Sequence, residues 1–208
     1  SDSYETALTL VDSLQDAEAA ALLKTALETR RASGTHYGVA QALVALGRLA
    51  YLGGDDTGAA SHIEAAAHIL HELRDEAGLE VVRLALSRVY RRAGRPDAAL
   101  SVLGDDAPPA DLAAVYRARG AFAEAIQVYE RWLADSEEAG DKTAAAMARL
   151  GLAETLIAAN RPDEARRAVA SDDSFGARWI RAALLHLSGN WAKACAAYEK
   201  LQADAPLE

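Results

Sequence analysis

Apolar and polar residues alternate along this chain with the period of amphipathic helices, and small turn residues interrupt that pattern at regular places. Each turn residue is followed five positions later by alanine and nine positions later by a bulky apolar residue. The turn residues are Gly54, Gly94, Gly120, Asn160 and Gly189. The alanines are Ala59, Ala99, Ala125, Ala165 and Ala194, and the bulky residues are Ile63, Leu103, Tyr129, Val169 and Tyr198. This order predicts stacked pairs of antiparallel helices that cross closely at a small residue.

The spacing of the turns indicates that long and short hairpins alternate. Successive turns are 40, 26, 40 and 29 residues apart. In the long units we expect the second helix to end at a glycine in the left-handed conformation, at Gly34, Gly78 and Gly140. In the short units the second helix is predicted to begin at Pro96 and Pro162, because proline fits the first helical turn.

The N-terminal segment fits the same pattern without its turn glycine. If Leu14 takes the turn position, Ala19 and Leu23 stand at the expected offsets. No run of alternating β-branched residues indicates a strand. We therefore predict an all-α chain of six hairpins, with Asp173 or Ser174 capping the helix that begins near Phe175.

One unit carries most of a known repeat consensus. Its residues are Leu43, Leu46-Gly47, Tyr51, Gly54-Asp55, Ala59, Ile63 and Ala66. They resemble the tetratricopeptide repeat family, and the long units resemble the extended repeats of bacterial signalling regulators and scaffolds. The resemblance implies a right-handed superhelical solenoid, one repeat domain over residues 1–208, whose first helices line a concave groove. The closing proline is missing, and Arg83, Arg149 and Arg178 replace the family's tryptophan.

Composition narrows the range of partners and compartments. The net charge of −9 and the pI of about 5.1 disfavour binding to nucleic acid. Charged residues interrupt every apolar run, so we expect no membrane span. The single cysteine, Cys195, excludes an internal disulfide and is typical of a reducing, cytoplasmic setting. Because the chain starts at Ser1 and ends in Leu207-Glu208, we expect it to be a fragment of a longer protein.

Candidate chemistry is sparse. His68 and His71 share a helix face and could make a metal site with Glu72 or Asp75. No zinc-type spacing is met, and a solvated helix face is the favoured interpretation. We expect Cys195 to be a buried small hydrophobe. No phosphate loop or nucleophile motif is found. We therefore predict a protein that is not an enzyme, with no cofactor and no metal.

The projected groove offers a stronger hypothesis. Positions ten, six and three residues before each turn share one helical face. Arginines and aromatic residues occupy many of these positions or lie beside them: Arg48, Tyr51, Arg88, Arg91, Arg92, Arg117 and Trp179. Arginine binds carboxylates through two parallel hydrogen bonds, so this face favours an acidic or C-terminal peptide. The alternative is that these arginines pair with acidic residues of neighbouring hairpins.

Two functions therefore remain open. The leading prediction is a scaffold module that binds a protein or peptide in its concave groove. The alternative is a self-associating or sensory domain of a bacterial regulator, in which the ends of the array form a homodimer or a segment of the parent protein fills the groove. The segment from Thr6 to Val11 and the segment from Tyr198 to Leu201 are the expected places for such a contact.

Overall fold

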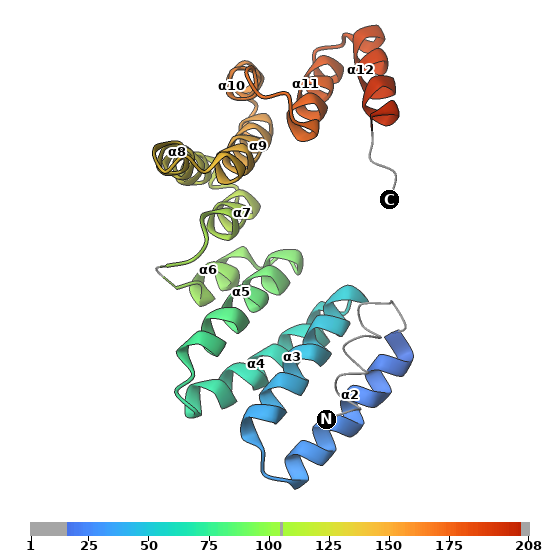
Figure 1. The fold of residues 1–208 in the computed structure, drawn as a ribbon, viewed down its shortest axis with the longest axis vertical. Coiled ribbons are helices and arrows are strands. Elements are labelled where there is room, and N and C mark those ends of the chain that lie inside the picture. Colours follow the sequence, from blue (N-terminus) through green and yellow to red (C-terminus); the bar gives the residue numbers. More distant parts are fainter. Residues whose placement is uncertain (1–15, 105, 205–208) are drawn as a thin grey trace. The chain divides into compact units, whose positions relative to one another are not determined.

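The computed structural model describes residues 16–104 and 106–204, and over these residues the chain is helical, with no strand. The helices, labelled as in Figure 1, are α2 (Asp16–Ala32), α3 (His36–Leu52), α4 (Asp56–Glu72), α5 (Glu76–Arg92), α6 (Pro96–Val102), α7 (Pro109–Arg119), α8 (Phe122–Glu138), α9 (Lys142–Ala158), α10 (Pro162–Ala168), α11 (Phe175–Leu187) and α12 (Trp191–Ala203). The predicted all-α class is confirmed for this part of the chain.

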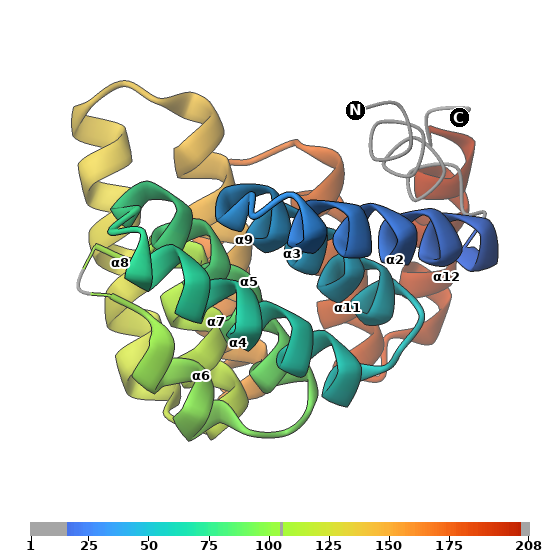
Figure 2. The same ribbon diagram turned by 90° about the horizontal axis from the view of Figure 1, so that it is seen from below.

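The helices fall into two compact units. Unit 1 is residues 1–107 and unit 2 is residues 108–208. In unit 1, α4 packs against both α3 and α5, while α2 packs on α3 and α6 on α5. In unit 2, α8 packs against α7 and α9 (Figure 2). Helix α9 also contacts α10 and α11. Within each unit, neighbouring helices in the sequence are therefore neighbours in space, as expected for stacked hairpins.

Each of the five predicted turns contains one residue in the left-handed backbone conformation. This residue lies between two antiparallel helices. Gly54, Gly94, Gly120 and Gly189 have φ between 70° and 81°, and Asn160 has φ of 59°. Glycine adopts this conformation without the Cβ penalty, and asparagine is one of the few other residues that tolerate it. The structure thus confirms five of the six predicted hairpins. The remaining hairpin is the N-terminal one, and its predicted first helix lies outside the described residues.

The alanine five residues after each turn is buried, as predicted. Ala59, Ala99, Ala125 and Ala165 are fully buried, and Ala194 is 2% exposed. The helices approach closely around such positions. A Cβ on Gly47 of α3 would lie 2.5 Å from Ile63 Cγ1 and 3.3 Å from the Ala59 carbonyl oxygen on α4. Small residues therefore permit the close crossing of α3 and α4.

The second helix of the long units ends as expected in two cases and differently in the third. Gly34 and Gly140 have φ of 68° and 72°. Gly78 does not end α4, and that prediction is wrong: Arg74 takes the left-handed conformation instead, with φ of 56°. Gly78 lies in the first turn of α5, where its N–H donates to Asp75 Oδ1 at 3.0 Å. Arg74 stands 20 residues after its turn, as Gly140 does, so the spacing already indicated it.

The short units contain second helices of only 7 residues, α6 and α10. Pro96 and Pro162 stand in their first turns as predicted. Ser174, one of the two predicted caps, accepts a hydrogen bond from the Ala177 N–H at 3.3 Å and starts α11. The right-handed course of the array and its unity as one domain stay predictions.

Candidate functional site

Unit 1 contains a groove between α3 and α5, the first helices of two successive hairpins. It consists of two hollows that share Val44 and Arg48. The apolar hollow, of about 280 Å³, is lined mainly by Tyr37, Ala40, Gln41, Val44, Arg48 and Val81. The arginine hollow, of about 310 Å³, is lined by Val44, Arg48, Tyr51, Leu52, Ile63, Ala85, Arg88 and Val89.

The arginine hollow combines an apolar floor with cationic walls. Ile63 and Val89 are buried at its base, 3% and 2% exposed. Arg48 on α3 and Arg88 on α5 are exposed residues at its sides. The hollow therefore offers dispersion contacts to an apolar group and guanidinium donors to a carboxylate. Three of the seven predicted groove residues, Arg48, Tyr51 and Arg88, line this one space.

The other two predicted residues of unit 1 occupy different settings. Arg91 is half-buried on α5, three residues after Arg88 and so on the neighbouring part of the same helix face. Arg92 forms an ion pair with Asp56, and its Nε donates to Asp56 Oδ1 at 2.6 Å. The Arg92 guanidinium also stacks 3.4 Å from the centroid of the Tyr51 ring. Arg92 therefore already has a carboxylate partner on a neighbouring hairpin.

The last two predicted residues belong to unit 2. Arg117 of α7 donates from Nη1 to Glu154 Oε2 of α9 at 2.9 Å, so its charge is paired within the chain. Trp179 of α11 is 48% exposed. On the same helix, His186 meets the Trp191 ring edge-on, with centroids 4.6 Å apart. Trp179 stands ten residues before its turn, where unit 1 carries Val44 and Leu84. Unit 2 thus has exposed aromatic area at a position that is aliphatic in unit 1.

A third hollow of unit 1 is polar, and no motif in the sequence indicated it. It has a volume of about 410 Å³ and includes Asp56, Glu64, Tyr90 and Arg95 in its lining. The Tyr90 hydroxyl donates to Glu64 Oε1, 26 residues away in sequence. Burial of the phenol, together with this hydrogen bond to a carboxylate, raises the pKa of Tyr90 to about 12. The Arg95 guanidinium lies 4.6 Å from the centroid of the same ring.

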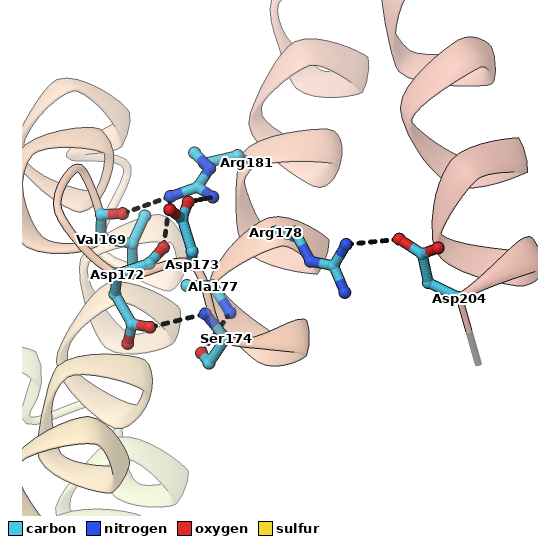
Figure 3. Close-up of polar contacts among 8 residues, drawn as sticks. All are labelled: Val169, Asp172, Asp173, Ser174, Ala177, Arg178, Arg181 and Asp204. Carbon is cyan, nitrogen blue, oxygen red and sulfur yellow. Dashed lines mark hydrogen bonds and ion pairs between the residues drawn. The ribbon is translucent and has the colours of Figure 1, made fainter. Parts of the chain in front are cut away.

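Arginines at the family's tryptophan position make ion pairs in unit 2. Arg149 pairs with Glu137, and Arg178 Nη1 donates to Asp204 Oδ2 at 2.6 Å, joining α11 to the end of α12 (Figure 3). Arg181, also on α11, donates to the backbone carbonyls of Val169 and Asp172. The Arg181 contacts hold the connection between α10 and α11. At the tryptophan position itself, Arg149 and Arg178 form ion pairs in place of an aromatic ring.

The remaining candidates for chemistry behave as surface groups. His68 Nδ1 lies 3.7 Å from Glu72 Oε1, and both side chains are largely exposed. Over residues 16–104 and 106–204, no three His, Cys, Asp or Glu side chains gather as a metal site requires. Cys195 is exposed, so the prediction that it is buried is wrong. Its neighbour Ala194 is buried in the hairpin, whereas Cys195 lies on the solvent side of α12. None of the described helices is both long and apolar enough to span a bilayer.

Family models of the tetratricopeptide repeat match four stretches of the chain. One matches residues 110–141, and a second matches residues 81–105, 146–171 and 176–200. Each stretch coincides with one helical hairpin, and together they cover just over half of the sequence. The chain belongs to the tetratricopeptide repeat family. Repeats of this family generally mediate interactions between proteins, and they are typically scaffolds without enzymatic activity.

Solved structures with this repeat resemble the chain over most of its length. One is a crystal structure of nearly identical TPR-like repeats from Podosopora anserina, described as a kinesin light chain, with a TM-score of 0.71 and 20% identity. The match covers 87% of this chain and 94% of the chain in that structure. A single-residue variant of those repeats has a TM-score of 0.72 and 18% identity, covering 91% and 95%. No curated protein matches the sequence. At these identities the likeness concerns the fold alone.

Proposed function

We propose that this tetratricopeptide repeat protein is a non-enzymatic scaffold whose unit 1 groove binds an acidic peptide segment of a partner protein. The observation that supports this function is the arginine hollow, where Arg48 and Arg88 flank a floor of buried apolar residues. The protein as a whole carries a net charge of −9, yet two arginines line this one hollow. Their guanidinium groups are suited to attract the carboxylates of a partner.

The two hollows indicate the chemistry of the peptide. Tyr37 and Val81, which are 52% and 61% exposed, line the apolar hollow. Arg88 lines the arginine hollow, and Arg48 lines both hollows. Tyr37 and Arg48 are 11 residues apart on α3, a distance of about 16 Å along a helix. An extended peptide covers about 16 Å in roughly five residues. The matching ligand therefore carries a bulky apolar side chain roughly five positions from its acidic residues.

A labelled synthetic peptide tests this function. It carries one phenylalanine roughly five positions from a pair of glutamates, and its binding to the full chain is followed by fluorescence anisotropy. The Arg48→Ala/Arg88→Ala double variant should weaken binding by roughly tenfold or more. It removes both guanidinium groups that are proposed to bind the glutamates of the peptide. Added salt should weaken binding to the unaltered chain, since exposed charges are screened.

Two controls separate groove binding from general charge attraction. Arg117→Ala removes one positive charge from unit 2 and should leave the affinity unchanged. A peptide with glutamines in place of the glutamates should bind the unaltered chain as weakly as the acidic peptide binds the double variant. Equal affinity of the acidic peptide for the unaltered chain and the double variant would rule out the arginine hollow as its site.

Self-association is the second candidate, and the exposed apolar residues of the C-terminal hairpin favour it. Trp179, Leu187 and Trp191 are 48%, 61% and 60% exposed. Of the two segments expected to dimerise, Thr6 to Val11 lies outside the described residues. In the other, Leu201 is buried at 5% exposure, so it is not available as a contact. Sedimentation velocity over a range of concentrations tests this candidate, with Trp191→Ala expected to abolish any dimer.

A further inference from the structure

Arg92, Asp56 and Tyr51 form a cluster at one end of the unit 1 groove. The Arg92 guanidinium lies 3.4 Å from the centroid of the Tyr51 ring, and Nε donates to Asp56 Oδ1 at 2.6 Å. A second nitrogen, Nη2, pairs with the same carboxylate oxygen. Tyr51 lies in the last turn of α3, Asp56 begins α4 and Arg92 ends α5. The cluster therefore ties together one end of each of three helices.

The setting of the pair strengthens it beyond an ordinary surface ion pair. The Arg92 and Asp56 side chains are 35% and 24% exposed, so solvent screens their attraction only in part. The carboxylate stands at the positive end of α4 and the guanidinium at the negative end of α5, which favours both charges. The ring of Tyr51 covers one face of the Arg92 guanidinium, and Asp56 accepts the hydrogen bond from Arg92 Nε.

We propose that Arg92 is a positioning residue that holds the Tyr51 ring and the end of α5 at a fixed separation, and thereby sets the width of the arginine hollow. This inference rests on the proposed peptide-binding function. Tyr51 lines the hollow together with Arg48 and Arg88, which stand on opposite helices. Arg92 is not among the residues that line the hollow, but it stacks on the Tyr51 ring, which does line it. Asp56, which sequence analysis did not single out, belongs to the same cluster. The cluster of Arg92, Asp56 and Tyr51 is called the clasp below.

Asp56→Asn distinguishes two roles for Arg92. Arg92 could be an anchor, which means an arginine that binds a carboxylate of the peptide directly, or it could be part of the clasp, and the two roles predict opposite changes in peptide affinity. If Arg92 were an anchor, Asp56→Asn would release its charge and strengthen binding of an acidic peptide. If the three residues form a clasp, Asp56→Asn loosens the groove, and binding of the labelled peptide weakens about threefold to tenfold. Arg92→Ala should weaken binding by a similar factor, and the double variant should be no weaker than either single variant, because one coupled unit is lost.

Salt dependence gives a readout that distinguishes the clasp from a charge contact. Removing an anchor such as Arg88 should reduce the slope of log Kd against log salt concentration, because one screened contact with the ligand is lost. Arg92→Ala should leave that slope unchanged. Arg92→Lys keeps the charge but loses the planar fork and the stacking surface, so it should restore little of the affinity. Tighter binding by Asp56→Asn, or a reduced slope for Arg92→Ala, would overturn the proposal.

A second measurement stands even if the peptide does not bind at all. Hydrogen exchange of the backbone amides at the ends of α3 and α5 should speed up in both Asp56→Asn and Arg92→Ala, while exchange in α8 and α9 stays the same. The matched control is Glu76→Gln, which removes one carboxylate from the first turn of α5 in the same unit and should change neither exchange nor affinity. Unaltered exchange in both clasp variants overturns the clasp regardless of the ligand, whereas faster exchange without peptide binding contradicts only the proposed function.

Discussion

The two units are built by the same repeat pattern and present different surfaces. In unit 1, the 17-residue helix α4 packs against α3 and α5, and a hollow of about 310 Å³ lies between those two helices. In unit 2, α10 has only 7 residues, and α11 packs directly on α9. There a Cβ on Gly176 of α11 would lie 2.7 Å from Leu150 Cδ1 of α9. In unit 2 the first helices contact each other directly, α11 with α9 and α7 with α9, whereas in unit 1 a hollow lies between α3 and α5.

Side chains at equivalent positions follow the same division. Six residues before the turn, unit 1 carries Arg48 and Arg88, whereas unit 2 carries Ala114, Glu154 and Ala183. The arginine of unit 2 that was predicted to bind a ligand, Arg117, is paired with Glu154 instead. Positions that determine the hairpin fold are therefore common to both units, while positions on the first-helix face are not. The difference shows that the fold and the chemistry of the first-helix face are encoded at separate positions of the repeat.

The largest effect should come from the shared core. Leu46→Ala in unit 1 and Leu184→Ala in unit 2, at residues 5% and 2% exposed, should each lower the free energy of unfolding by about 2–5 kcal/mol. Because repeats interact mainly with their neighbours, hydrogen exchange should rise mostly within the altered unit. Chemical denaturation and exchange mass spectrometry measure both effects. A Leu184→Ala variant with faster exchange chiefly in α3 would contradict the division into two units.

The close helix crossings should respond alike in both units. Ala59→Leu and Ala125→Leu place a large side chain at a fully buried position, and each should cost about 1–3 kcal/mol by overpacking. Ala192→Leu is the control, since that residue is exposed on α12. Thermal melts compare the three variants. An unaltered melting temperature for Ala125→Leu would show that this alanine is not at the crossing.

Alkaline pH should destabilise unit 1 through Tyr90, because the equivalent position of unit 2 holds no titratable residue. The pKa of Tyr90 is raised to about 12 from an ordinary 10.0, so folding favours the neutral phenol. Its stabilising contribution is complete below pH 10 and is lost as the pH rises through about 12. The residue 66 positions later is the buried Leu156, which does not titrate. Denaturation at rising pH should show a steeper loss of stability for the unaltered chain than for Tyr90→Phe. Parallel curves would contradict this.

The smallest effect should come from the paired arginine of unit 2. The Arg117 and Glu154 side chains are 32% and 50% exposed, and such pairs typically contribute about 0–1 kcal/mol. Arg117→Ala should therefore change the unfolding free energy only within that range. Isothermal titration with the acidic peptide should also give an unchanged affinity. Loss of binding in this variant would mean that unit 2 takes part in the peptide site.

Much of the fold could be predicted because the decisive signals are local. A left-handed turn and a buried alanine five residues later depend on backbone geometry and on one helix crossing, and both leave a fixed spacing in the sequence. Arg74 was missed because a charged residue occupies a position where glycine is usual. Cys195 was misplaced although the buried Ala194 already marks the face of α12 that α11 covers. Each residue turns a helix by about 100°, so the residue after Ala194 lies off that face.

The site was predictable only in part, because it depends on contacts between distant residues. Counting back from the turns brought Arg48, Tyr51 and Arg88 to one face, and all three line the same hollow. The partners of Arg92 and Arg117 are 36 and 37 residues away in sequence. Those pairings depend on how the hairpins pack, which no local spacing records. The role proposed for Arg92 therefore rests on contacts that only the structure gives.

The left-handed turns have a consequence for how related sequences are compared. Gly54, Gly94, Gly120, Asn160 and Gly189 are all exposed, yet each is restricted by the positive φ of its backbone. Evolution should preserve these surface residues as strictly as core residues, because most substitutions there strain the chain. A conservation map would therefore highlight five exposed points whose constraint is conformational. Selection for a partner should instead be sought at the variable arginine positions of the first helices.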